Sequence, residues 1–130
     1  MVRHCIWRKT NPSPANGQHM WLSSFENCIF AKRRRTKFNQ NCKSSVWDFP
    51  VGRGKRHPTE KPLELFKYLI ESSSDEGDIV FDPCIGSGTT AIASIELNRN
   101  YLGFELDKEY CDLANNRVEE YLKENKNVFT

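Results

Sequence analysis

The sequence has no long apolar run, no paired-cysteine spacing and no segment of low complexity. Nowhere do about 20 apolar residues follow one another, the length that a membrane-spanning helix requires. Residues 1–9 are interrupted by basic side chains and lack the apolar core of a signal peptide. The five cysteines are odd in number and show no C-x-x-C spacing, so neither a disulfide framework nor a zinc site is indicated. We therefore expect a cytoplasmic protein with reduced thiols, no metal and no membrane contact.

The composition is that of a soluble globular protein. With 130 residues, 38% hydrophobic and 28% charged, the chain fits one domain. A net charge of +2 is too small to indicate a nucleic-acid partner by itself, but the basic residues gather in two clusters in the first half, at residues 32–37 and 53–57. Taken alone, each cluster is interpreted as a solvated surface loop.

The second half alternates strand-like and helix-like patterns. Residues 79–81 form a short apolar run that predicts a buried strand, and residues 89–97 predict a helix whose small side chains allow tight packing. Residues 101–104 predict a second strand, and residues 110–122 have helical spacing. This order is typical of a parallel crossover unit, in which ligands bind at the carboxyl ends of the strands.

The first half gives weaker signals. Residues 28–31 and 45–47 have the composition of short strands. Pro62 is well placed at the start of a helix, because proline is tolerated in a first turn. The apolar face of that helix consists of Leu63, Phe66, Leu69 and Ile70.

A glycine loop and an acidic residue mark the candidate site. Gly86-Ser87-Gly88 lies between a predicted strand and a predicted helix, where a backbone must turn sharply and approach a ligand closely. Glu105 follows the second strand, 23 positions after Asp82, and is placed to accept hydrogen bonds from ribose hydroxyls. Together these features predict a nucleoside-binding crevice.

The spacing does not identify the nucleoside. Gly86-x-Gly88-x-x-Ala91 also satisfies the dinucleotide fingerprint with alanine in its third position, so NAD stays open as a ligand. A P-loop is excluded, because no lysine follows the second glycine.

Longer strings carry a family resemblance. The sequence DPCIGSGTT, from Asp82 to Thr90, resembles the S-adenosylmethionine loop of DNA methyltransferases that modify N6 of adenine or N4 of cytosine. Residues 57–62 resemble the family segment that leads into the helix before this loop, and residues 102–107 resemble its ribose-binding strand. Residues 6–12 and 26–32 resemble segments downstream of the catalytic motif, so the resemblance covers nearly the whole chain and indicates the permuted branch, in which the catalytic region precedes the cofactor region.

The resemblance implies an α/β fold: an incomplete Rossmann-like methyltransferase fold with a mostly parallel sheet and flanking helices. The chain would form one partial domain, with a strand and loop region over 1–56 and the S-adenosylmethionine-binding βαβα region over 57–123. The cofactor-binding residues that it implies are Thr59, Glu60, Lys61, Asp82, Pro83, Gly86, Ser87, Gly88, Thr89 and Glu105. DNA would be the partner, in a restriction-modification setting. The residues expected on its phosphates are Lys32, Arg33, Arg34, Arg35, Arg53 and Lys55.

The family's catalytic tetrapeptide, Asp/Asn/Ser-Pro-Pro followed by an aromatic residue, does not occur in the sequence. In the family this motif grips the flipped base, and positioning supplies much of the rate. We therefore expect no catalytic residue in this chain, little activity by the chain alone, and a start after the motif, either as a truncated product or beside a separate chain that carries it. The alternatives are a non-catalytic remnant that binds nucleoside or DNA and an NAD-binding Rossmann fragment. Adenine and cytosine targets are not distinguished, because the discriminating residue belongs to the tetrapeptide.

Two further residues, Cys84 and Asp107, are interpreted singly. Cys84 stands where family members often carry an aromatic side chain, and its position gives no reason to expect a catalytic thiol. Asp107 is interpreted as a helix cap rather than as a cofactor ligand.

Overall fold

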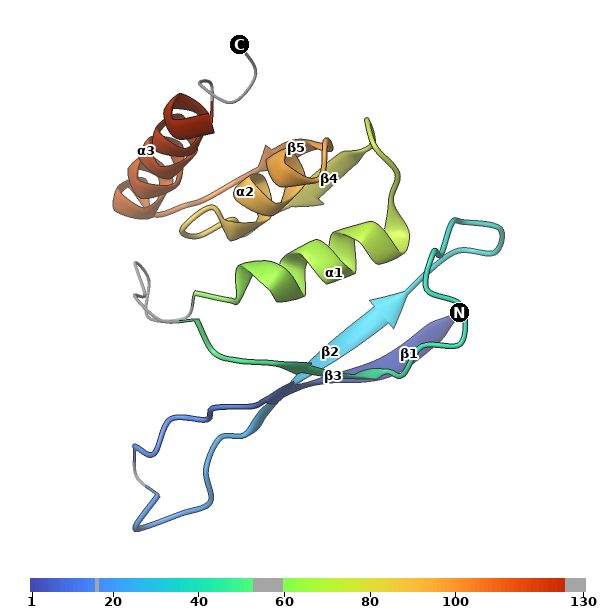
Figure 1. The fold of residues 1–130 in the computed structure, drawn as a ribbon, viewed down its shortest axis with the longest axis vertical. Coiled ribbons are helices and arrows are strands. Elements are labelled where there is room, and N and C mark those ends of the chain that lie inside the picture. Colours follow the sequence, from blue (N-terminus) through green and yellow to red (C-terminus); the bar gives the residue numbers. More distant parts are fainter. Residues whose placement is uncertain (16, 53–59, 126–130) are drawn as a thin grey trace.

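The computed structural model describes residues 1–15, 17–52 and 60–125 (Figure 1). The elements in chain order are β1 (Val2–Lys9), β2 (Phe25–Ala31), β3 (Val46–Phe49), α1 (Leu63–Ser73), β4 (Ile79–Asp82), α2 (Thr89–Glu96), β5 (Asn100–Gly103) and α3 (Lys108–Asn125). Over these ranges no helix is both long and apolar enough to span a membrane.

The strands form two sheets. In the first, of order β2-β1-β3, β1 is antiparallel to β2 and parallel to β3. In the second, β4 and β5 are parallel and are connected through α2. The predicted α/β architecture with mostly parallel pairing is confirmed, but within the described parts of the chain no strand joins the two sheets.

β1 is the central strand of the first sheet, and the sequence patterns did not predict it. Its apolar residues Cys5, Ile6 and Trp7 are consecutive and lie between two pairs of basic residues, so the sequence shows no strand-like alternation. Cys5 and Trp7 point to the covered face and are each 4% exposed. The Trp7 indole Nε1 donates a 2.8 Å hydrogen bond to the Phe49 carbonyl oxygen on β3, which fixes the ring at the end of the sheet.

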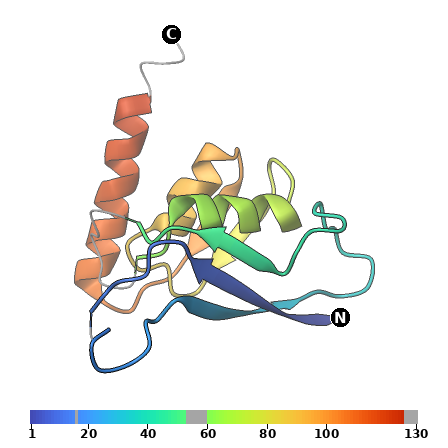
Figure 2. The same ribbon diagram turned by 60° about the horizontal axis from the view of Figure 1, so that its bottom comes forward.

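α1 packs on the covered face of this sheet (Figure 2). The Tyr68 ring lies 6.2 Å from that of Trp47 and 5.9 Å from that of Phe49, centroid to centroid. The helix begins directly after Pro62, as predicted to within one residue. Leu65 is its most buried apolar side chain, a position that the sequence pattern did not include in the apolar face.

α2 is the most buried element. All six residues from Thr89 to Ser94 are buried, and their small side chains let the helix pack against α1, α3 and β5 at once. This confirms the predicted helix and its close packing.

β4 is a strand, as predicted, but the expectation that it is buried is wrong for one of its faces. Ile79 is 70% exposed and Phe81 is 57% exposed. Val80 points to the opposite face and is half-buried beneath the helices. Within the described chain, helices cover only one face of the β4–β5 sheet, so the residues on the other face remain open to solvent.

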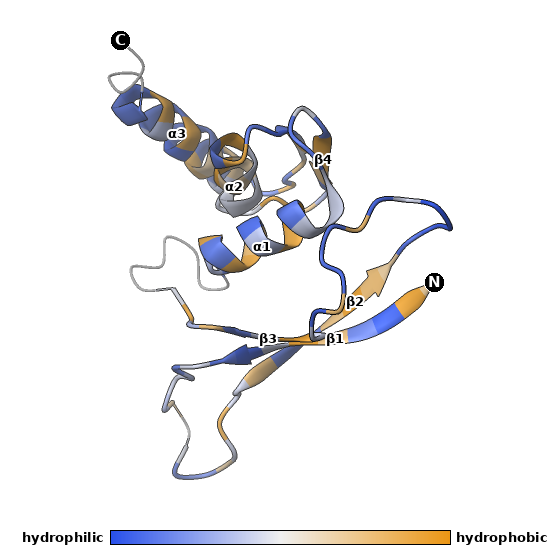
Figure 3. Ribbon diagram, turned by 45° about the vertical axis from the view of Figure 1, so that its right-hand side comes forward, coloured by the Kyte–Doolittle hydropathy of each residue, from blue (hydrophilic) through white to orange (hydrophobic). Residues whose placement is uncertain are grey.

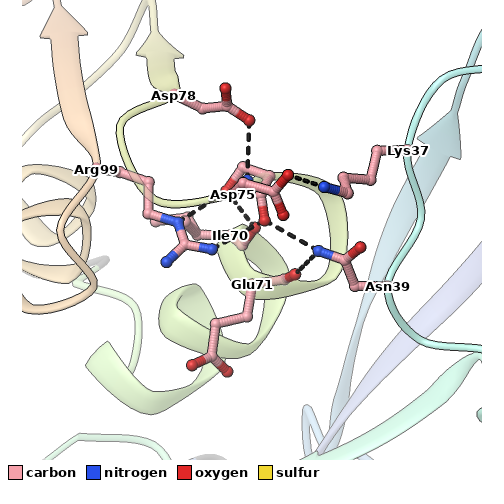
Figure 4. Close-up of polar contacts among 8 residues, drawn as sticks. Lys37, Asn39, Ile70, Glu71, Asp75, Asp78 and Arg99 are labelled. Carbon is pink, nitrogen blue, oxygen red and sulfur yellow. Dashed lines mark hydrogen bonds and ion pairs between the residues drawn. The ribbon is translucent and has the colours of Figure 1, made fainter.

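The carboxyl end of α1 is held by polar side chains from two distant segments (Figure 4). The Asn39 side-chain amide donates to the carbonyl oxygens of Glu71 and Ser74, at 2.9 and 3.0 Å. The Arg99 guanidinium donates to the Ser74 carbonyl at 2.8 Å. These donors satisfy carbonyls that a helix end leaves free, and they tie the loop after β2 and the residue before β5 to the end of α1.

Candidate functional site

A pocket of about 280 Å³ opens at the carboxyl ends of β4 and β5. The glycine loop, the segment before α1 and the residue after β5 form its wall. The lining residues are Glu60, Lys61, Phe66, Cys84, Ile85, Gly86, Ser87, Thr89, Thr90 and Glu105. Six of the residues singled out from the sequence therefore share one cavity, although up to 45 positions separate them in the chain (60 to 105).

The two glycines of the loop have different roles. Both adopt positive φ, 54° at Gly86 and 81° at Gly88, which disfavours any side chain. A Cβ at Gly86 would meet nothing closer than 4.0 Å, so this backbone is open to a ligand. A Cβ at Gly88 would lie 3.1 Å from the Ala114 Cβ, so this glycine allows α3 to pack closely on the start of α2.

Asp82 holds the glycine loop through two hydrogen bonds to its carboxylate. One carboxylate oxygen accepts a hydrogen bond from the Cys84 backbone N–H at 3.0 Å, and the other accepts one from the Thr90 hydroxyl at 2.5 Å. Asp82 and Gly88 do not line the pocket, and neither does Pro83. Of these three predicted residues, Asp82 holds the loop through hydrogen bonds and Gly88 allows α3 to pack against it.

Glu105 faces the loop from the end of β5. Its carboxylate accepts hydrogen bonds from the backbone N–H groups of Gly86, at 2.9 Å, and Asp107, at 3.0 Å. The bond from Asp107 contributes most to holding the pKa of Glu105 below its ordinary value, and the bond from Gly86 adds to it. The carboxylate is therefore ionised at neutral pH, and each oxygen retains a lone pair for a ligand hydroxyl.

Asp107 caps α3. Its side-chain oxygen accepts from the backbone N–H groups of Glu109, at 2.8 Å, and Tyr110, at 3.3 Å. This confirms its interpretation as a helix cap.

Arg117 on α3 does not line the pocket, but it contacts three residues that do, and the sequence patterns did not reveal it. Its guanidinium donates to the Ser87 carbonyl at 3.0 Å and to the Thr89 hydroxyl at 3.2 Å, and it forms a 3.2 Å ion pair with Glu60. The side chains of this pair are only 11% and 15% exposed. No local pattern marks an arginine in the middle of a charged helix, so only the packing of α3 on the loop reveals its role.

Lys61 connects the pocket to the first sheet. Its ammonium forms a 2.6 Å ion pair with Glu26 on β2 and lies 5.8 Å from the centre of the Trp7 ring. Partial burial alone would raise the pKa of Glu26, but hydrogen bonds from Lys61 and Lys9 outweigh it and lower that pKa. Lys61 lines the pocket while its charge is already paired within the protein.

The basic cluster of residues 32–37 lies at the other end of α1 from the pocket (Figure 1). The Lys32 ammonium donates to the Thr36 carbonyl at 2.8 Å, and Lys37 forms an ion pair with Asp75. The three arginines between them, at positions 33–35, are exposed. Thr59, Arg53 and Lys55 lie outside the described residues.

The geometry suits a nucleoside with an attached amino-acid group. The open backbone at Gly86 leads to the amino end of α2, where N–H groups favour a carboxylate. Glu105 offers a carboxylate to ribose hydroxyls. The pocket's volume of about 280 Å³ is close to the lower end of the range of about 300–1,000 Å³ that ligand pockets commonly enclose. No cluster of side chains suited to a metal ion occurs in the portion of the chain that is described.

Comparison with known proteins agrees with this assignment. The DNA methylase family profile matches residues 3–116. The type II methyltransferase M.HinfI of Haemophilus influenzae is 35% identical over 149 aligned positions, covering 98% of this chain and 41% of the relative. M2.MboI of Moraxella bovis is 36% identical and covers 95% and 51%. The chain thus spans about half the length of these curated relatives.

A solved structure shows the same fold. The complex of M1.HpyAVI with S-adenosylmethionine superposes with a TM-score of 0.75 at 33% identity, over 91% of this chain and 62% of that one. The profile match covers most of the chain, and the glycine loop and acidic residue that carried the resemblance lie together in one pocket. The chain therefore belongs to the family of S-adenosylmethionine-dependent DNA methyltransferases that modify N6 of adenine or N4 of cytosine.

Proposed function

We propose that this chain is the cofactor-binding part of a cytoplasmic restriction-modification DNA methyltransferase, which transfers a methyl group from S-adenosylmethionine to the exocyclic amine of adenine or cytosine. The observation that carries the proposal is the single pocket that joins Glu60, Gly86 and Glu105 at the carboxyl ends of two parallel strands. Of the two regions expected within the single domain 1–130, the one over 57–123 includes the pocket-lining residues between 60 and 105, and the one over 1–56 includes the sheet on which α1 rests.

The residues of the pocket have separate tasks in this proposal. Glu105 holds the ribose, and the Gly86 backbone and the start of α2 receive the amino-acid end. Glu60 and Lys61 border the same space from the segment before α1. The bound cofactor would supply the sulfonium methyl group, and the chain's own residues bind and orient that cofactor.

Ligand titration tests the proposal. Calorimetry of the purified chain should show binding of S-adenosylhomocysteine and no comparable binding of NAD, because the string from Asp82 to Thr90 resembles the S-adenosylmethionine loop and the solved structure with the same fold is a complex with S-adenosylmethionine. Tighter binding of NAD would replace the methyltransferase assignment with a dinucleotide-binding one. Binding of neither ligand would remove the cofactor assignment.

The chain by itself should methylate DNA poorly. The tetrapeptide that grips the target base in this family is absent from the sequence. Tritiated S-adenosylmethionine incubated with the chain and DNA should therefore leave DNA unlabelled. Robust labelling would refute this proposal, whereas labelling only after a polypeptide with the tetrapeptide is added would support a split catalytic site and exclude a non-catalytic remnant.

A further inference from the structure

A second cavity lies between the first sheet and α1, at the opposite end of this helix from the cofactor pocket. It encloses about 480 Å³, a volume within the range of about 300–1,000 Å³ that ligand pockets commonly have. Its walls are formed by β1, β2, β3, the second half of α1 and the loop between β2 and β3. Figure 3 shows this loop as a mainly hydrophilic segment that passes the carboxyl end of α1. The second cavity shares no lining residue with the cofactor pocket.

Aromatic rings form much of the wall of the second cavity. Phe30 on β2 and Phe38 in the following loop lie with their ring centroids 5.3 Å apart. Trp47 on β3 and Tyr68 on α1 form another ring pair, 6.2 Å apart. The four rings come from four different segments, so only the folded chain brings them to one cavity. Aromatic faces stack on planar ligands, and proteins that bind single nucleic-acid strands hold bases in this way.

Three cationic side chains border the same cavity, those of Arg3, Lys32 and Lys43, and none of the described residues that line it carries a carboxylate. Arg3 pairs with Phe30 across the β1–β2 ladder, so both side chains leave the sheet on the same face. The Lys32 ammonium lies 5.7 Å from the centre of the Phe38 ring. Neither Arg3 nor Lys43 forms an ion pair or a side-chain hydrogen bond with any residue that the structure describes. Two such cations beside an aromatic wall favour an anionic ligand that also has a planar group.

Gln40 adds a polar group that can recognise a base. Its side chain lines the second cavity and forms no hydrogen bond with a described residue. The amide both donates and accepts, which matches the N6 and N7 edge of adenine. We propose that the second cavity binds a nucleotide, with the base stacked on the aromatic wall and the phosphate held by Arg3 and Lys43. This site is separate from the cofactor pocket, and the inference does not depend on the proposed function.

A planar base with an attached phosphate is the chemistry shared by two sources, a free nucleoside monophosphate and an unpaired nucleotide of a DNA strand. The exposed arginines at positions 33–35 directly follow Lys32, so further phosphates of a strand would meet more positive charge beside the cavity. The experiment therefore includes one probe for each source.

Calorimetric titration of the full 130-residue chain with deoxyadenosine monophosphate tests the proposal, with and without saturating S-adenosylhomocysteine. The nucleotide should bind equally well in both conditions. Adenosine and inorganic phosphate should each bind at least about tenfold more weakly, because each lacks one half of the contacts. The double variant Arg3→Met/Lys43→Met should lose at least about tenfold in nucleotide affinity, since it removes the charged donors to the phosphate. Phe38→Leu should weaken nucleotide binding about fivefold or more, because it removes a stacking face while keeping an apolar side chain.

The matched control is Lys108→Met/Lys123→Met, which makes the same change in net charge at two exposed lysines of α3 and should leave nucleotide binding unchanged. Thermal unfolding of each variant checks that it folds. The proposal is overturned if the nucleotide does not bind or if S-adenosylhomocysteine displaces it. Equal binding by the Arg3→Met/Lys43→Met variant, or binding of inorganic phosphate as tight as that of the nucleotide, would overturn it as well.

A single-stranded oligonucleotide distinguishes the two sources. An oligonucleotide that displaces deoxyadenosine monophosphate, and that the Arg3→Met/Lys43→Met variant binds more weakly than the control variant does, assigns the second cavity to a DNA strand. Nucleotide binding that the oligonucleotide does not displace assigns the cavity to a free nucleotide. Either result supports the nucleotide site.

Discussion

The two parts of this chain are built by different means. The unit β4–α2–β5 is continuous in sequence, and residues 79–105 supply seven of the ten residues that line the pocket. The sheet β2-β1-β3 is assembled from distant segments, as in the pairing of Ile6 with Val46, 40 positions later. The first part supplies most of the pocket wall, and the second packs against α1 and, through Glu26, pairs with the side chain of Lys61.

The two parts also differ in how far the faces of their sheets are covered. The first sheet buries Trp7 and Cys5 on the face that α1 covers, and a cavity of about 480 Å³ remains between this sheet and the helix. The β4–β5 sheet has α2 on one face and exposed aromatic and aliphatic residues on the other. A unit of two strands and one helix can therefore form the glycine loop although one face of its sheet is uncovered.

Gly88 tests how strongly the cofactor unit depends on close packing. Gly88→Ala should lower the free energy of unfolding by about 2–5 kcal/mol, from about 1–2 for the left-handed backbone and about 1–3 for crowding against Ala114. Gly77→Ala is the matched control, because it also has positive φ but open space around it, and should cost only the first contribution. Urea unfolding of both variants provides the measurement, and equal losses would show that packing against α3 does not matter.

Glu105 tests whether ligand binding belongs to the cofactor unit alone. Glu105→Ala should weaken S-adenosylhomocysteine binding by about tenfold to 100-fold, because it removes charge-assisted hydrogen bonds to the ribose and to the loop. Glu109→Ala, an exposed acid four positions later, should bind as the wild type does. Because the pKa of Glu105 is lowered from 4.5, wild-type affinity should stay constant as the pH falls towards that value and decline only below it. Calorimetry across this pH range would contradict the role if affinity were lost near neutrality.

Arg117 tests the link from α3 to the loop. Arg117→Met should reduce stability by about 1–2 kcal/mol and weaken ligand binding several-fold, because the loop carbonyl and Glu60 lose a charged partner that is largely buried. Lys108→Met on the same helix removes an ion pair whose side chains are 86% and 58% exposed and should have almost no effect. Thermal unfolding with and without ligand separates the two effects. If the two variants behaved identically, the Arg117 side chain would contribute no more to stability and binding than an exposed surface charge does.

The smallest effect is expected at the exposed arginines of the first part. Replacing Arg33, Arg34 and Arg35 with alanine should lower DNA affinity modestly and flatten its dependence on salt, since the slope is proportional to the number of phosphates that the protein neutralises. The effect is limited because the cluster lies at the far end of α1 from the pocket. Fluorescence anisotropy at several salt concentrations measures the slope. An unchanged slope would show that these arginines do not neutralise DNA phosphates and belong to a solvated loop.

The cofactor unit could be predicted because its signals are local. An apolar run, two glycines and a helix of small residues each determine a conformation from neighbouring positions, and the structure contains β4, α2 and β5 where these patterns indicate them. β1 was not predicted, since its identity as a central strand depends on pairing with β2 and β3, which lie far away in sequence. Arg117 was not predicted for the same reason, because its hydrogen-bond partners lie 28 and 30 positions away in the sequence.

The sequence alone determined the chemistry of the site. Gly86 and Glu105 indicated a nucleoside crevice, and the string from Asp82 to Thr90 indicated the methyltransferase family, because backbone freedom and charge are properties of residue type. Only the tertiary structure decided which of these residues face the pocket, that Asp82 and Gly88 serve the frame of the loop, and that one face of the β4–β5 sheet is open. These features depend on contacts between segments that are distant in sequence. Such contacts are determined by packing in the folded chain and by no local sequence pattern.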